Sequence, residues 1–185
     1  MIVEILDLIN DQLKGIDPAE KVYGQAQTVI RISGSEQDEL PGLIGADGEI
    51  KYVGIDDVES IIIYHKVNSV SIIQQNNGRG DAVGDMQDTF SLSLIAYWDR
   101  KKIKFLPDQL LLMLQARLPQ EVRGITDIKT VRIRPVNTIL NTLQIFNTEY
   151  RGNSFKLPAN IHLIQLNYNI ETVFNPDCFR KCPEC

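Results

Sequence analysis

Strict alternation of apolar and polar residues is the clearest pattern in this chain. Within residues 161–174, the run Ile164-Gln165-Leu166-Asn167-Tyr168-Asn169-Ile170-Glu171 changes character at every position. A period of two predicts a β-strand with one buried face and one solvated face. The solvated face would carry amides and a carboxylate, which do not make a nucleophile and its base. The strand therefore informs the fold and indicates no reaction.

Other segments with β-strand character come earlier in the chain. We expect one strand over residues 21–33 and a long one over residues 90–98, where Leu92 should be buried in the core as Leu166 is in the last strand. The β-branched runs within residues 58–75 predict two strands joined by a turn at Asn68-Ser69. Two further signals are a tight turn at Asp47-Gly48 and a short strand over Val131–Arg134 that ends at Pro135.

Helical spacing predicts three helices. The first covers residues 2–14, with its apolar residues on one side, and Gly15 and Pro18 should end it. The second opens at Pro107 and runs to Leu118, since proline is tolerated in the first turn of a helix. The third should be capped by Asn137 and carry Ile139, Leu140, Leu143 and Phe146.

This order of elements predicts the α+β class, with a mixed or mainly antiparallel β-sheet and helices packed on one face. The chain has 185 residues, 43% of them hydrophobic, which suffices for one core. We expect residues 1–174 to form a single α+β domain with projecting loops at 34–48, 76–86 and 147–158. Residues 175–185 would follow as a cysteine-containing tail.

The acidic charge balance narrows the functional classes. A net charge of -5 argues against a nucleic-acid binder held by phosphate contacts. No apolar run is long enough to span a bilayer, and the first residues carry acids where a signal peptide needs bases. We therefore expect synthesis in the cytosol, with no membrane partner and no sequence-specific nucleic acid.

All three cysteines lie in the tail, as Cys178, Cys182 and Cys185. Their C-x3-C-x2-C spacing matches the iron–sulfur motif of radical SAM enzymes, but we interpret the match as accidental because those enzymes place it ahead of a long chain. A zinc site would need a fourth ligand, from His162, His65 or a cysteine of a neighbouring subunit. The alternative, which we favour, is a tail of free thiols with no cofactor bound.

No catalytic arrangement is legible in the rest of the sequence. The two histidines lie in apolar strands, and no Ser-His-Asp, Cys-His or HExxH pattern occurs. Arg79 and Asp81 belong to an Arg-Gly-Asp tripeptide in a glycine-rich segment, which adhesion ligands also use. We prefer the interpretation that this segment is a hairpin arm that reaches a neighbour.

Two further features indicate contact surfaces. Basic residues cluster at 100–104 and at 129–134, where Arg132 and Arg134 share one strand face. They could bind nucleic acid, lie solvated, or face acidic strips of another subunit, and we prefer the last interpretation. Tyr150 and Phe155 lie in an otherwise polar loop, where exposed aromatic residues would mark an interface.

The order and character of these elements resemble the ring-forming connector and tail-terminator proteins of tailed bacteriophages. Members have an amino-terminal helix before a sheet, helices on one face and a final strand that returns to the sheet. These roles would be filled by residues 2–14, 58–75 with 87–98, 107–118 and 161–174. The region 21–55 and the cysteine tail depart from the simplest members.

The resemblance implies a structural virion protein without catalysis, assembled in the host cytoplasm as a homo-oligomeric ring at the head–tail junction. Its neighbours would be portal or adaptor proteins and tail-tube proteins. The three loops would be contact arms, and the acidic charge would suit a lumen that DNA passes. The alternatives are a small-molecule or peptide-binding module on a concave sheet face, or a C-terminal zinc-binding protein. An enzyme ranks third.

Overall fold

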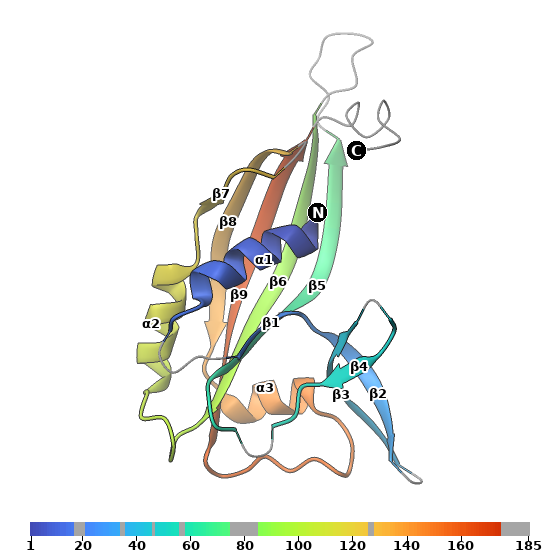
Figure 1. Cartoon of the computed structure of the whole chain (residues 1–185), viewed down its shortest axis with the longest axis vertical. Helices are drawn as coiled ribbons and strands as arrows, with labels where there is room; N and C mark the ends of the chain where they lie inside the picture. The colour runs from blue at the N-terminus through green and yellow to red at the C-terminus, as the bar shows by residue number, and fades with distance from the viewer. Residues whose placement is uncertain are drawn as a thin grey trace.

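Two β-sheets and three helices make up the part of the chain that the computed structural model describes, namely residues 1–16, 21–33, 36–45, 47–55, 58–74, 85–125 and 128–174 (Figure 1). The elements in chain order are α1 (Ile2–Leu13), β1 (Lys21–Gln25), β2 (Gln27–Ser33), β3 (Glu36–Ile44), β4 (Ile50–Tyr52), β5 (Ile62–Gln74), β6 (Met86–Asp99), α2 (Pro107–Arg117), β7 (Glu121–Val122), β8 (Ile128–Ile139), α3 (Thr142–Glu149) and β9 (Ile161–Phe174).

The larger sheet has six strands in the order β1-β5-β6-β9-β8-β7. Its four long strands are paired antiparallel, and only β1 joins in parallel. The alternation of β9 is matched by its burial, since Leu166, Tyr168 and Ile170 are fully enclosed and the residues between them are half-buried. The α+β class and the mainly antiparallel sheet predicted from the sequence are thus confirmed.

Helices cover both faces of this sheet, not one. α1 and α2 pack on the face that carries Leu92, Leu94 and Leu166. α3 packs on the opposite face, against Tyr97 and Leu163, together with the smaller sheet. The reason is visible in β6, which is buried at every position from Leu92 to Asp99 and so needs apolar cover on both sides.

The ends of β8 and α3 differ from the sequence prediction. β8 continues through Pro135, which lies at an irregularity in the pairing with β9, a position where proline is tolerated. Asn137 is therefore a strand residue, and its side-chain oxygen accepts a hydrogen bond from Asn167. The cap of α3 is Asn141, whose side chain accepts from the backbone N–H of Gln144 at 3.1 Å.

The segment 58–75 contains one strand and no turn at Asn68-Ser69. β5 runs unbroken from Ile62 to Gln74, with an irregularity in its register between Val67 and Ser69. Asn68 is one extra residue on β5 between the pairs Val67–Leu92 and Ser69–Ser91, as in a β-bulge. The expected strand over 21–33 is in turn divided at Ala26 into β1 and β2, which belong to different sheets.

The smaller sheet occupies most of the predicted loop 34–48. β2, β3 and β4 pair antiparallel, and β3 includes Pro41 and Gly42, which are buried despite their loop-like character. The turn at Asp47-Gly48 is confirmed, since Gly48 has a φ of 82° and its N–H donates to the Gly45 carbonyl. The loop 147–158 begins inside α3, and of the loop 76–86 only Asp85 and Met86 lie within the described residues.

Gly152 is a position where any side chain should be costly. Its φ is 130°, and a Cβ atom there would overlap Oδ1 of Asp38, which is fully buried on β3. Gly152→Ala should therefore lower the free energy of unfolding by about 2 kcal/mol or more. Urea unfolding measures this, with Gly24→Ala as the control because a Cβ at Gly24 meets no atom within 4 Å. Equal stability of the two variants would contradict the prediction.

Candidate interaction surface

His65 is buried in a purely structural contact. Its Nε2 lies 2.8 Å from Oδ1 of Asn10 on α1, and its Nδ1 lies 2.7 Å from the hydroxyl of Tyr168 on β9. The proton therefore belongs on Nε2, which donates to Asn10, while Nδ1 accepts from Tyr168. Burial lowers the pKa of His65 to about 3. With both nitrogens engaged, His65 cannot serve as the fourth zinc ligand that the sequence allowed.

The other parts of the zinc prediction are not decided. His162 is half-buried, with its ring centroid 5.4 Å from that of Trp98, and burial together with the charge of Arg100 lowers its pKa. The tail cysteines, Cys178, Cys182 and Cys185, lie outside the described residues. Within the described ranges, no group of three or more His, Cys, Asp or Glu side chains could hold a metal ion.

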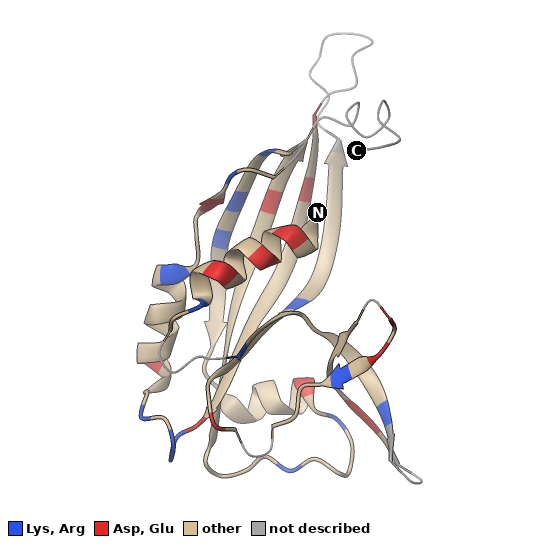
Figure 2. Ribbon diagram, in the orientation of Figure 1, with Lys and Arg blue, Asp and Glu red and all other residues tan. Residues whose placement is uncertain are grey.

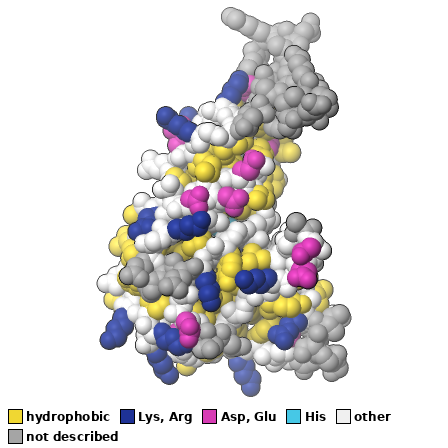
Figure 3. All heavy atoms as spheres, viewed as in Figure 1, with side chains coloured by type: hydrophobic (Ala, Val, Ile, Leu, Met, Phe, Trp, Pro, Cys, Tyr) yellow, Lys and Arg dark blue, Asp and Glu magenta, His cyan; other side chains and the backbone are white. Residues whose placement is uncertain are grey.

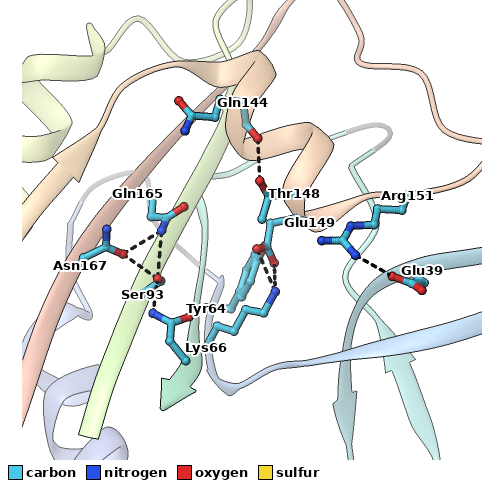
Figure 4. Close-up of polar contacts among 11 residues, drawn as sticks. Glu39, Tyr64, Lys66, Ser93, Gln144, Thr148, Glu149, Arg151, Gln165 and Asn167 are labelled. Carbon is cyan, nitrogen blue, oxygen red and sulfur yellow. Dashed lines mark hydrogen bonds and ion pairs between the residues drawn. The ribbon is translucent and has the colours of Figure 1, made fainter.

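A buried ion pair ties α3 to β5 (Figure 4). Lys66 Nζ lies 3.0 Å and 3.2 Å from the two carboxylate oxygens of Glu149, and the Tyr64 hydroxyl donates to the same carboxylate at 3.3 Å. Burial, with the neighbouring Tyr150 and Glu149, raises the pKa of Tyr64. Glu149 is only 3% exposed, so this cluster joins α3 to β5 through a largely buried carboxylate.

The polar side of the long strands forms its own hydrogen-bond network (Figure 4). Ser93 Oγ donates to Oδ1 of Asn167 at 2.7 Å, and Gln165 Nε2 donates to the same oxygen at 2.7 Å. Asn68 donates to Ser93 Oγ at 2.9 Å, which explains how a turn-forming residue is accommodated in β5. The amides that the sequence placed on the solvated face are thus engaged with one another.

Tyr150 does not lie at the surface, contrary to the expectation. Its ring stacks on Phe146 at 5.3 Å and meets Phe155 edge-on at 5.7 Å, and its hydroxyl donates to the carbonyl of Val53. Tyr150 is 3% exposed and Phe155 is half-buried against the same core. The prediction that Tyr150 is an exposed interface residue is therefore wrong, whereas Phe155 keeps part of its side chain at the surface.

Arg132 and Arg134 are exposed on one face of β8, as the alternation predicted. Figure 2 shows blue bands of Lys and Arg along β8. Arg134 lies 3.4 Å from Glu171. Arg132 lies between two grooves, of about 400 Å³ beside β7 and about 150 Å³ over β9. Glu121 lines the larger groove and Glu171 the smaller, so neither is strongly basic. Arg79 and Asp81 lie outside the described residues.

The most unusual surface is the outer edge of β5. β6 pairs with the whole of β5 on its inner side, whereas β1 pairs with the outer side only as far as His65. The outer side of Lys66–Gln74 therefore borders no strand in the described part of the chain. We call this stretch the open β5 edge. Val70, Ile72 and Ile73 on it are 52%, 63% and 55% exposed. Figure 3 shows apolar side chains at the surface over the upper part of the sheet.

The open β5 edge lacks the features that protect edges in monomeric proteins. No charged residue and no proline occurs from Val67 to Gln74. Charges, prolines and short strands are the usual means of preventing association at an edge. The sequence contained this signal as a long neutral β-branched run, but the turn expected at Asn68-Ser69 concealed it.

A second open edge lies on the other side of the sheet. β7 pairs with β8 only at Val131 and Arg132, so Arg134–Ile139, the open β8 edge, has no outer strand among the residues described. Large apolar side chains are again exposed on and after it, at Val136, Leu140 and Leu143. The molecule therefore presents two different apolar edges on opposite sides of one sheet.

Comparison with known proteins adds no relative. No protein-family model matches this chain, and no curated protein matches it either. Among the helices of the described ranges, none is long and apolar enough to cross a bilayer.

Proposed function

We propose that this chain is a structural subunit that assembles with copies of itself into a ring. The observation that carries the proposal is the open β5 edge, whose outer side pairs with no strand of the described ranges and which exposes Val70, Ile72 and Ile73. An edge of this kind is a ready template for another chain, and burying its apolar side chains would favour association. From Val67 to Gln74 this edge carries no charge that would have to be desolvated.

Ring closure requires two different complementary patches on each subunit, because each copy contacts its two neighbours through different surfaces. The open β5 edge and the open β8 edge meet this requirement, since they lie at opposite sides of the sheet. A single self-complementary patch would instead stop at a dimer. The arrangement of the exposed apolar residues therefore supports a ring over a closed pair.

The buried polar groups support an assembly role over catalysis. His65, Tyr64 and Glu149 are buried titratable residues, and each takes part in a contact that joins two elements of the fold. None of these three residues lines either of the two grooves beside Arg132. An enzyme needs its reactive groups at a site that a substrate can reach.

We further propose that the ring is a connector or tail terminator at the head–tail junction of a tailed bacteriophage. The support is the order of elements, with α1 ahead of the sheet, α2 after β6, and β9 as a final strand placed between β6 and β8. In this role the protein belongs to the virion, with portal or adaptor proteins on one side of the ring and tail-tube proteins on the other.

Ile72→Lys tests the proposal, because a charge on the open β5 edge would be buried on assembly. Light scattering over a range of concentrations should show wild-type mass above that of one chain. The variant should need at least about a hundredfold higher concentration to assemble. Leu112→Lys is the matched control, since Leu112 is a similarly exposed apolar residue that lies on α2 and not on β5 or β8.

Circular dichroism must show that both variants fold, and Ile72→Val should assemble as the wild type does. A wild-type protein that remains a single chain at every concentration would contradict the proposal. So would an Ile72→Lys variant that assembles as well as Leu112→Lys.

A further inference from the structure

We infer that the open β5 edge of one copy pairs antiparallel with the open β8 edge of the next, so that the sheet continues from subunit to subunit. This inference rests on the proposed ring and specifies its interface. The partner of the open β5 edge is then a second copy of this chain, and the part of that copy that docks is its open β8 edge.

The strand directions favour this pairing. From β5 to β6, from β6 to β9 and from β9 to β8, every neighbouring pair is antiparallel. β8 therefore runs opposite to β5. Copies arranged around a ring axis share one orientation along that axis, so β8 of one copy meets β5 of its neighbour antiparallel. The contact would repeat the pairing that already builds the sheet.

The chemistry of the two edges is also matched. On β5, no charged residue occurs from Val67 to Gln74. In the sequence that includes the end of β8 and most of α3, no charged residue occurs from Pro135 to Thr148. Pairing would bring apolar Val70 and Ile72 close to Val136 without burying an unpaired charge. Pro135 lacks a backbone donor, so the new ladder should form mainly beyond it, over Val136–Ile139.

The other open edges in the described part of the chain fit less well. β2 and β4 are the outer strands of the smaller sheet, and they carry exposed Arg31 and Lys51. β1 and β7, the outer strands of the larger sheet, are short and carry exposed Lys21 and Glu121. Charged residues and short strands oppose strand addition. On the open β8 edge the charged residue, Arg134, lies ahead of the ladder proposed over Val136–Ile139. Pairing of β5 with β5 of another copy would need a twofold axis. Such a contact occupies the open β5 edge of both copies, so the assembly would stop at a dimer.

The register within the sheet predicts how neighbours are offset. Asn137 lies level with Lys66, through the pairs Asn137–Asn167, Asn167–Ser93 and Ser93–Lys66. The open β8 edge begins at Arg134, which lies level with Ser69, so within one sheet the two open edges overlap in height only over Lys66–Ser69. Full pairing requires a shift of several residues along the strands, and in closed sheets such a stagger accompanies strands tilted to the axis.

Mixing two edge variants of the full chain tests the inference. Ile72→Lys keeps an intact β8 edge, and Val136→Lys keeps an intact β5 edge. Each variant alone should fail to assemble at the concentration where the wild type is fully assembled. Their mixture should form a one-to-one dimer that does not grow, because the one contact between intact edges leaves two damaged edges outside. Native mass spectrometry identifies this dimer.

The outcomes separate this inference from the proposed ring. If Val136→Lys alone assembles like the wild type, or if the mixture of variants stays as single chains, the β5–β8 contact is wrong, whereas a wild-type ring would still stand. If Val136→Lys forms only dimers through its β5 edge, the twofold β5–β5 contact replaces it. A wild type that never assembles ends the proposed function itself. Circular dichroism of each variant confirms folding, and Val136 is exposed enough to tolerate lysine.

Discussion

Lys66→Met should lower the free energy of unfolding by about 3 kcal/mol. The substitution removes the ammonium that lies 3.0 Å from Glu149 and leaves that carboxylate buried, with only the Tyr64 hydroxyl as a remaining partner. Lys66 itself is partly accessible to water, so the pair is screened to some extent, and the expected loss lies at the lower end of the range for buried pairs. Urea unfolding of the two proteins measures it.

Neutralising the stranded carboxylate should recover part of this loss. The double variant Lys66→Met with Glu149→Gln should be more stable than Lys66→Met alone by about 1 kcal/mol or more, because no charge is then buried. Arg151→Met is the control, since its pair with Glu39 is exposed and should contribute less than about 1 kcal/mol. Equal losses in Lys66→Met and Arg151→Met would show that burial of Glu149 has no energetic consequence.

Acidification from about pH 7 to about pH 4 should lower the stability by about 3 kcal/mol through His65 alone. The folded pKa of His65 is lowered from 6.5 to about 3, so the neutral imidazole is the form that the fold accommodates. This stability is fully present above the unfolded pKa. It is lost as the pH falls below 6.5, because the unfolded chain then binds a proton that the folded chain excludes.

Histidine NMR signals and a matched pair of variants test this prediction. The ring of His65 should not titrate between pH 8 and pH 4 while the protein is folded. His65→Gln retains a donor and an acceptor, and its unfolding free energy should depend less on pH over this range. His162→Gln should keep the steep wild-type dependence. A folded-state His65 signal that titrates near pH 6 would overturn the account of its burial.

The long periodic elements were predictable from the sequence because their own residues determine them. The helix over 2–14 and the strands over 90–98 and 161–174 each carry an uninterrupted pattern, and the structure confirms them. Their apolar sides, including Leu92 and Leu166, are fully buried as expected. For such elements one face must be covered wherever they are placed, so local pattern and global packing agree.

The errors fall where a neighbouring strand decides the local structure. Proline and asparagine are common in turns. Nevertheless, β8 continues through Pro135 because β9 pairs with it on both sides, and β5 continues through Asn68 because β6 does the same. β3 forms across a proline and a glycine because β2 pairs with it from Glu36 to Gly42. These pairings join residues that are distant in the sequence, so the local composition carries no sign of them.

The candidate surface was only partly predictable for the same reason. Strand alternation placed Arg132 and Arg134 correctly on one face, because that inference needs no partner. Tyr150 was misplaced because a polar loop can fold over its own aromatic residues. The sequence shows the neutral β-branched run of β5, but it does not show that this run is an edge, because the edge begins where β1 stops pairing.

We propose that this molecule functions through the two open edges of its sheet, which join identical copies into a closed ring. Native mass spectrometry of the wild-type assembly tests it most directly. We expect one dominant species with a mass that is a fixed whole-number multiple of 20.9 kDa and that stays constant as concentration rises. A single chain at all concentrations, or a ladder of species that lengthens without limit, would contradict it.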